Sequence, residues 1–246
     1  MTVLLSEAGM DAGTHTYWLE QTEADVPLSN DWLSAGEISR FATVRFEKRR
    51  RDWRLGRWTA KRAVASCLNI LNDVDLFAEI EIRAAPSGAP CVFFFNRPAA
   101  VSISLSHCAG YALCVVGSPR ASLGCDLEAV ESRDHSFATD FFTGNEQDLV
   151  HSASADERPL LTTLVWSAKE SALKALHVGL RLETTCLEVI PAYSSQHDAD
   201  RAHEGADIAW LPLSLHRSNG QILHGCWRCA NHMVRTVVFN PLRELS

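Results

Sequence analysis

The segment WSAKESALKAL, Trp166–Leu176, repeats an earlier part of the chain. The earlier copy, WTAKRAVASCL, spans Trp58–Leu68, and Trp, Ala, Lys and Leu recur at matching positions. Apolar residues at helical spacing predict a helix for each copy. The repeat indicates two subdomains of similar shape; the alternative is a chance recurrence in two helices, because only eleven residues match. The main difference between the copies is that Arg62 in the first corresponds to Glu170 in the second.

Each half of the chain is expected to contain one long helix followed by strands. The helices are predicted over about 34–69 and 160–177. Strands or strand pairs are predicted over 78–95, 101–117, 123–130, 181–190 and 220–241. We therefore predict an α+β fold, built as a pseudo-two-fold arrangement of two similar subdomains, 1–118 and 119–246.

The composition is that of an ordinary globular protein. The 246 residues are 46% hydrophobic and 22% charged, and no apolar run approaches the roughly 18 residues of a membrane helix. The first residues lack the basic region of a secretory signal, and most of the eight cysteines lie in apolar runs, as expected for reduced thiols. We therefore expect a cytoplasmic protein without a membrane partner. Cys226 and Cys229 have redox or zinc spacing, but no second pair accompanies them, so we disfavour such a site.

Positive charge is concentrated in one segment of an acidic chain. The net charge is −7, yet nine of the eighteen residues from Arg45 to Arg62 are Lys or Arg. Four of these cations follow helical spacing and predict a stripe that binds an anion such as phosphate; the alternative is a solvated basic face. The stripe consists of Arg50, Arg54, Arg57 and Lys61. The acidic balance of the rest argues against a nucleic-acid partner.

Carboxylates and a lysine of the second half suggest metal-assisted chemistry. Asp126 and Glu128 in GCDLE lie two apart on a predicted strand, so both point to the same face. Hard oxygen ligands suit Mg²⁺, and Glu170 is a candidate third ligand, with Lys174 one turn further along the helix. The alternatives are two solvated carboxylates on the strand and an exposed Glu170–Lys174 ion pair on the helix.

In chain order, the motifs resemble those of a known family. They are RRRDWRLGRWTAKRAV, SGAP, SISLSHC, LGCDLE, FFTGNE and WSAKESALKAL. The chain resembles the 4′-phosphopantetheinyl transferases, in particular the large two-lobed, surfactin-synthetase-activating type, from about residue 40 to residue 185. The pair formed by the GCDLE and WSAKESALK motifs is the most specific part of this resemblance.

The resemblance implies two lobes with an active site at their interface. It implies a holo-[acyl-carrier-protein] synthase that moves the phosphopantetheine group of coenzyme A onto a serine of an apo carrier protein and releases 3′,5′-ADP. The carriers would serve fatty acid, polyketide or nonribosomal peptide synthesis. Coenzyme A would be the co-substrate and Mg²⁺, or Mn²⁺ in its place, the cofactor. We expect a monomer, because one chain holds both lobes.

The resemblance also implies roles for particular residues. Asp126, Glu128 and Glu170 match the metal carboxylates, and Glu170 and Lys174 are the implied catalytic residues. The residues implied to contact coenzyme A are Arg49, Arg57, Arg83, Ser106, His107, Lys169 and Lys174. The N-terminal subdomain would then hold the nucleotide end, and the C-terminal subdomain the metal. The chain departs from the family at Ala89, where a lysine is frequent, and at Ser104, where an asparagine is frequent.

The same residues are compatible with two other functions. A different Mg²⁺-dependent enzyme could process a nucleotide or phosphodiester with the same three carboxylates and the basic stripe. A non-enzymatic module could instead dock its basic helix on an acidic partner or a nucleic acid. Against the second alternative, a nucleic-acid binder usually shows exposed aromatic residues and a basic overall charge.

Overall fold

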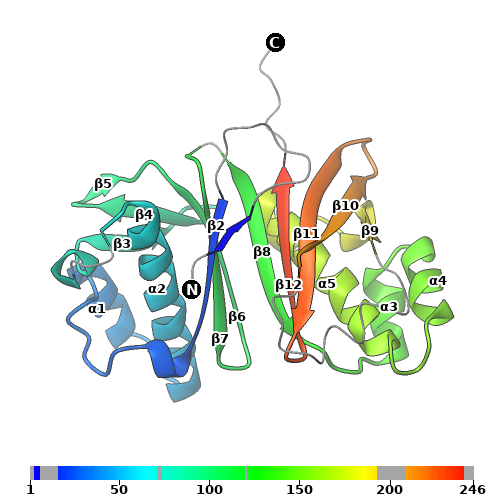
Figure 1. The fold of residues 1–246 in the computed structure, drawn as a ribbon, viewed down its shortest axis with the longest axis horizontal. Helices are drawn as coiled ribbons and strands as arrows, with labels where there is room; N and C mark the ends of the chain where they lie inside the picture. The colour runs from blue at the N-terminus through cyan, green and yellow to red at the C-terminus, as the bar shows by residue number, and fades with distance from the viewer. Residues whose placement is uncertain (1–2, 6–15, 71–73, 120, 193–208, 241–246) are drawn as a thin grey trace, which may run out of the picture. The chain divides into compact units, whose positions relative to one another are not determined.

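The computed structural model describes residues 3–5, 16–70, 74–119, 121–192 and 209–240. The chain divides into two compact units, Met1–Ala121 (unit 1) and Ser122–Ser246 (unit 2) (Figure 1). Helices and strands occur in both units, so the predicted α+β class is confirmed. None of the helices in the described ranges is long and apolar enough to cross a bilayer.

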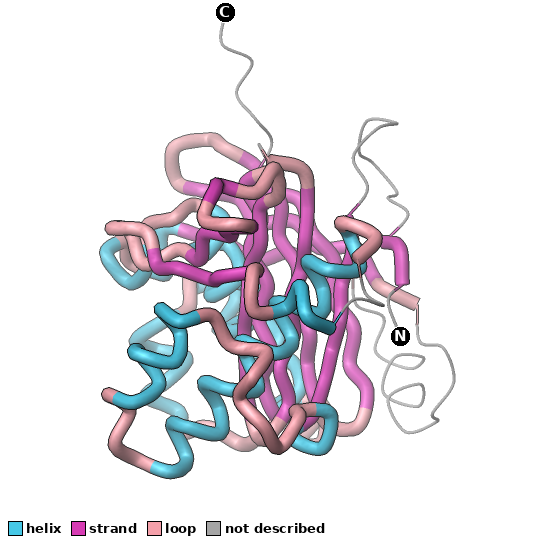
Figure 2. Tube along the Cα trace, turned by 90° about the vertical axis from the view of Figure 1, so that its left-hand side faces the viewer, coloured by secondary structure: helices cyan, strands magenta, loops and turns pink. Residues whose placement is uncertain are grey.

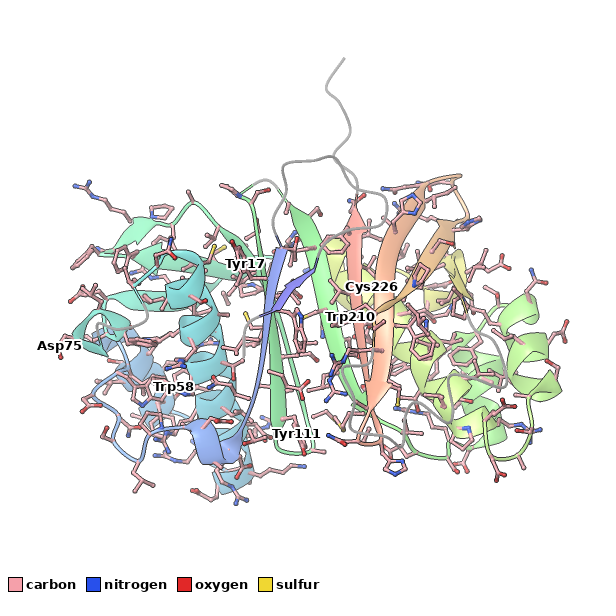
Figure 3. All side chains as sticks on the ribbon, viewed as in Figure 1. Tyr17, Trp58, Asp75, Tyr111, Trp210 and Cys226 are labelled. Atoms are coloured by element: carbon pink, nitrogen blue, oxygen red, sulfur yellow. The ribbon has the colours of Figure 1, made fainter. Side chains whose placement is uncertain are left out.

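Unit 1 packs its longest helix, α2 (Glu47–Cys67), on an antiparallel sheet (Figure 2). The sheet has the order β1 (Val3–Leu5), β2 (Thr16–Thr22), β7 (Tyr111–Gly117), β6 (Ser102–Cys108). A smaller sheet contains β3 (Ile80–Ala84), β4 (Pro90–Phe94) and β5 (Arg97–Pro98). The other helical segments are η1 (Glu23–Asp25), α1 (Ala35–Ala42) and η2 (Val74–Phe77). Trp58 of α2 lies in the core of the unit, with its ring centroid 5.2 Å from those of Trp32 and Phe77 (Figure 3).

Unit 2 has the same plan, with helix α5 (Arg158–Ala175) packed on a five-stranded antiparallel sheet. The strand order is β8 (Ser122–Ala129), β12 (Met233–Asn240), β11 (Ile222–Ala230), β10 (Leu211–Arg217), β9 (Leu187–Pro191). The other helical segments are α3 (His135–Phe141), α4 (Gly144–Ser152), η3 (Gly179–Arg181) and η4 (Thr184–Cys186). The repeated segments Trp58–Leu68 and Trp166–Leu176 therefore lie, as predicted, on the long helix of each unit.

Two predicted elements have different bounds in the structure. The single helix expected over 34–69 is two helices, because α1 ends at Ala42 and α2 begins at Glu47. The connection contains Thr43 and Val44, β-branched residues with low helix propensity. The strand expected over 181–190 begins only at Leu187, since two 3₁₀ turns precede it.

A buried ion pair joins three elements of unit 1. Ser34 caps α1, and Glu37 completes the capping box by accepting a hydrogen bond from the Ser34 backbone N–H. The other Glu37 oxygen accepts from the N–H of Ile82 on β3. The ammonium nitrogen of Lys61 on α2 lies 2.6 Å from Glu37 Oε2 and donates to the carbonyl groups of Trp32 and Phe77. One glutamate thus links α1, α2 and β3.

Unit 2 contains the same arrangement. Thr143 caps α4, and Glu146 accepts from the backbone N–H groups of Thr143 and of Val189 on β9. The ammonium nitrogen of Lys169 on α5 lies 2.8 Å from Glu146 Oε2, and both side chains are at most 1% exposed. Lys169 also donates to two backbone carbonyl groups, those of Thr184 and Leu187. The lysine shared by both copies of the repeat therefore anchors the long helix of each unit to a capped helix and a strand.

Strand β8 and helix α5 of unit 2 touch through their backbones at Gly124. A Cβ atom at this position would lie 1.9 Å from the carbonyl oxygen of Ser171 and 2.6 Å from the backbone nitrogen of Ala175. These distances are too short for any side chain larger than hydrogen. The hydroxyl group of Ser122 donates to the Ala175 carbonyl group beside this contact. Glycine in LGCDLE thus sets how closely the strand approaches the helix.

Replacing Lys61 with methionine should lower the free energy of unfolding by about 3–5 kcal/mol, because the Glu37 charge would remain buried without its ammonium partner. Urea denaturation monitored by circular dichroism measures the loss. Lys48→Met, at an exposed position of the same helix, is the matched control and should change stability little. Adding Glu37→Gln to Lys61→Met should recover part of the loss. Equal stability of Lys61→Met and wild type would contradict the role given to the pair.

Replacing Gly124 with alanine should destabilise the protein by about 3 kcal/mol, because the added methyl group meets backbone atoms that cannot rotate away. The control is Gly144→Ala at the start of α4, where an added Cβ has no neighbour within 4 Å. Thermal and urea unfolding of both variants measure the difference. A Gly124→Ala variant as stable as Gly144→Ala would show that β8 can move off α5 at little cost.

Candidate active site

The candidate site lies where alternate residues of β8 face successive turns of α5. Asp126 and Glu128 share a face of the strand, and Trp166, Glu170 and Lys174 form one row on the helix. Asp126 of the strand contacts Lys174 of the helix.

Asp126 and Lys174 form the innermost pair of this site. The ammonium nitrogen of Lys174 lies 2.8 Å from Asp126 Oδ1 and 2.9 Å from the carbonyl oxygen of Cys125. Asp126 is only 4% exposed. Burial by itself lowers the pKa of Lys174, but the negative charges of Asp126 and Glu170 outweigh it, and the pKa is raised. Lys174 therefore keeps its positive charge at neutral pH.

Glu128 and Glu170 flank this pair, and both are half-buried. The pKa of each carboxyl group is raised, first by burial and then by the negative charge of Asp126. Glu128 also forms an ion pair with Arg133, at 3.4 Å. The three carboxylates thus lie close enough for the charge of Asp126 to act on both of its neighbours.

The chemistry of these donors suits a hard cation. Carboxylate oxygens are the ligands that Mg²⁺ prefers, and a divalent cation would relieve the repulsion that raises the two pKa values. Within the described ranges, however, no three His, Cys, Asp or Glu side chains are arranged as a metal-binding group. Lys174 and Arg133 instead neutralise Asp126 and Glu128 in this structure. The donor set therefore fits Mg²⁺ in its chemistry, while the carboxylates are not gathered around one point.

Lys169 does not lie where a coenzyme A contact was expected. The family resemblance implied that it contacts coenzyme A, but its side chain is fully buried. All of its contacts described above are with Glu146 and with backbone carbonyl groups of unit 2. These contacts give Lys169 a structural role and do not support the predicted contact with coenzyme A.

The predicted basic stripe of α2 is also not a free anion site. Each of its four cations is already paired within unit 1: Arg50 with Glu47, Arg57 and Lys61 with Glu37, and Arg54 with backbone carbonyl groups of residues 27–29. The sequence did not reveal these partners because most of them lie outside the helix. The stripe serves mainly to hold the N-terminal segment and α1 against α2.

A cavity of about 570 Å³ lies beside the start of α2 in unit 1. Two residues implied by the sequence line it together, Arg49 of α2 and His107 of β6. Arg40, Arg45 and Trp53 are also in its wall. Three guanidinium groups and an indole ring provide charge for a phosphate group and a flat surface for a base.

The other three residues implied for the nucleotide end, Arg57, Arg83 and Ser106, do not line this cavity. Ser106 is 9% exposed, whereas its neighbour His107 is exposed, as alternation along β6 requires. Arg83 of β3 hydrogen-bonds to Glu81 and Asn96 instead. Neither contact to coenzyme A is supported by the geometry of unit 1.

Two kinds of residue near these contacts were not predicted from the sequence. Glu37 and Glu146 lie three residues after Ser34 and Thr143, and this capping-box spacing could have predicted both helix starts from the sequence. Arg133 follows β8 in a loop, and no pattern in the sequence connects it with Glu128. Only the folded chain places its guanidinium group beside that carboxylate.

The CWRC segment offers no redox or zinc site. Cys226 and Cys229 lie three positions apart on β11, so their side chains leave opposite faces of the strand. Burial raises the pKa of Cys229 to about 11, which leaves almost no thiolate at neutral pH.

Comparison with known proteins identifies the region around this site. Residues 122–226 match the model of the 4′-phosphopantetheinyl transferase superfamily. The chain is also similar to the 4′-phosphopantetheinyl transferase HetI of Nostoc sp. (strain PCC 7120 / SAG 25.82 / UTEX 2576), with 25% identity over 176 residues. This match covers 70% of the present chain and 72% of that protein. The resemblance predicted from the sequence is therefore confirmed, and unit 2 carries the pattern of the 4′-phosphopantetheinyl transferase superfamily.

Proposed function

We propose that this protein transfers the phosphopantetheine group of coenzyme A to a serine of an apo carrier protein and releases 3′,5′-ADP. One observation carries the proposal: Asp126 and Glu128 on β8 face Glu170 and Lys174 on α5. These residues lie in the segment that matches the family model. The match supports phosphopantetheinyl transfer in general; coenzyme A as donor, and a carrier of fatty acid, polyketide or nonribosomal peptide synthesis as acceptor, are our inference.

The residues of unit 2 divide the chemical work between them. Asp126, Glu128 and Glu170 would hold Mg²⁺, which when bound supplies positive charge to the pyrophosphate of the substrate. Glu170 accepts the proton of the carrier serine hydroxyl, and its raised pKa makes it a stronger base than an ordinary glutamate. The serine oxygen forms a bond to the β-phosphorus, and the bond from that phosphorus to the oxygen of 3′,5′-ADP breaks. Lys174, held protonated, neutralises charge on this leaving group.

Unit 1 is proposed to hold the nucleotide end of coenzyme A. Arg49 and His107 line one cavity, and its additional arginines suit the 3′-phosphate group. Arg57 is held by Glu37 and Arg83 by Glu81, so we leave both out of the proposed contacts.

The direct test is incubation of the purified protein with Mg²⁺, coenzyme A and a panel of apo carrier proteins. Intact-mass spectrometry should show a carrier that gains one phosphopantetheine group, and 3′,5′-ADP should appear in equal amount. Reactions with EDTA should show no gain. If the folded protein modifies none of the acyl and peptidyl carriers tested, the proposed function is wrong.

Glu170→Gln should lower the transfer rate by roughly 100-fold or more, because the amide cannot accept the serine proton. The fold should be kept, since the substitution removes a charge that Asp126 repels. Glu183→Gln, at an exposed position of the same unit, is the control and should transfer at the wild-type rate. A wild-type rate for Glu170→Gln would remove this residue from the proposed chemistry.

Arg49→Ala should raise the KM for coenzyme A by about tenfold while changing kcat little, because a charged hydrogen bond to phosphate contributes about 1.5–3 kcal/mol to binding. Arg51→Ala removes an exposed arginine of the same helix that does not line the cavity. Steady-state kinetics with varied coenzyme A distinguishes the two variants. The same measurement with 3′-dephospho-coenzyme A should abolish the difference, and an equal KM for Arg49→Ala and Arg51→Ala would contradict the assignment of the cavity.

A further inference from the structure

Three buried hydroxyl groups join α5 to β12 in unit 2, and the proposed chemistry gives them no role. Thr236 Oγ1 lies 2.7 Å from Ser171 Oγ and 2.9 Å from Ser167 Oγ. The Thr236 hydroxyl group also donates to the carbonyl oxygen of Ser167, at 3.0 Å. All three side chains are fully buried. A hydroxyl group has one hydrogen and two lone pairs, so Thr236 can make all three contacts at once.

These contacts run beside the Asp126–Lys174 pair. On the sheet, Thr236 lies directly opposite Asp126 in the pairing of β12 with β8, so the two side chains share a face. On the helix, Ser171 and Lys174 are neighbours because they are three residues apart. Two neighbouring residues of the helix are thus bonded to two neighbouring residues of the sheet.

The corresponding positions of unit 1 use their side chains differently. Thr59, at the position of Ser167 in the repeat, donates to the Leu55 carbonyl group of its own helix. Ala63, at the position of Ser171, has no hydroxyl group. The long helix of unit 1 packs on its sheet without hydroxyl contacts at these positions, so packing alone does not require them. They are found in the copy of the repeat that carries the carboxylate and the lysine of the candidate site.

The hydroxyl contacts complement the anchor at Lys169. That lysine ties α5 to α4 and β9, and β9 is the edge of the sheet opposite β8. An anchor at one edge leaves the helix able to swing at the other edge, where Lys174 reaches Asp126. Thr236 lies on β12, next to β8, and its hydrogen bonds are directional, whereas apolar contacts are not. A swing of α5 would stretch these bonds and the Lys174–Asp126 contact together.

We propose that Ser167, Ser171 and Thr236 are positioning residues that hold α5 on the sheet at the distance and angle at which Lys174 contacts Asp126. The proposal rests on the proposed function only for its effect on transfer, because a displaced Lys174 would no longer be aimed at the leaving group. The effect on the Lys174–Asp126 contact is independent of that function.

A double-mutant cycle tests the effect on this contact without any reaction. Thr236→Val removes the hydroxyl group and keeps the shape of the side chain, and Lys174→Met removes the ammonium group. If the two residues are coupled, their losses of stability do not add. Lys174→Met should therefore lower the folding equilibrium constant less in Thr236→Val than in the wild type, by roughly threefold or more. Urea unfolding of the full-length chains, followed by circular dichroism, measures the difference.

The matched control is Thr162→Val, also on α5. The Thr162 hydroxyl group donates to the Arg158 carbonyl group of its own helix, and the side chain is 7% exposed. Thr162→Val therefore removes a buried hydroxyl group from the same helix without touching the contacts to β12. Its loss of stability should add to that of Lys174→Met.

Steady-state kinetics tests the effect on transfer. Thr236→Val should lower kcat by roughly tenfold, because a displacement of about 1 Å at a reacting group can lower a rate by about 100-fold. The KM for coenzyme A should stay the same, since the nucleotide end is proposed to bind unit 1. Thr236→Ser keeps the hydroxyl group and should restore most of the rate, and Thr162→Val should keep the wild-type kcat. Ser171→Ala adds no bulk and should show the same loss, so it decides the question if Thr236→Val is unstable.

The outcomes distinguish this proposal from the proposed function. Additive losses in the cycle, or a wild-type kcat in both Thr236→Val and Ser171→Ala, would overturn the positioning proposal alone. An equal fall in kcat for Thr162→Val would overturn it as well, because any buried hydroxyl group of α5 would then have the same effect. A wild-type protein that modifies no carrier would contradict the function, and the double-mutant cycle would still decide whether the hydroxyl groups hold Lys174 on Asp126.

Discussion

The buried lysine–glutamate pair is the interaction on which each unit is organised. A charge taken out of water is stable only if every polar group around it is satisfied. Lys61 and Lys169 meet this demand in the same way, with one glutamate and two backbone carbonyl groups each. Because each glutamate also completes a helix cap and bonds to a strand, the pair fixes where three elements meet. The long helix then has little freedom to turn about its axis.

In unit 2 this fixed orientation is what presents the candidate site. Lys169 points into the core, so the adjacent Glu170 points out of it, toward the half-buried region beside Asp126. Gly124 brings the strand onto the helix backbone at the other end of the same contact. Parts of the structure that have no chemical role thus bury Glu128 and Glu170, and this burial is the main cause of their raised pKa values.

The sequence predicted the features that depend on local spacing. Period two placed Asp126 and Glu128 on one strand face, and the repeat placed two similar helices in two α+β halves. Features that depend on distant partners could not be predicted. Lys169 is next to Glu170 in the chain, but its partner is a helix cap more than twenty residues away. Arg54 and Arg57 of α2 likewise appeared free because their partners, the carbonyl groups of residues 27–29 and Glu37, lie on other segments.

The packing of β8 against α5 also limits where residues can be inserted into the chain or deleted from it. Glu170 and Lys174 are aligned with the strand because four residues bring a helical side chain back to the same face. A single residue inserted between Trp166 and Glu170 would rotate everything beyond it by about 100° and move Glu170 off this face. Substitutions at solvent-facing positions of α5 leave the alignment intact. Insertions and deletions are therefore expected in the loops around α3 and α4 and not within these two elements.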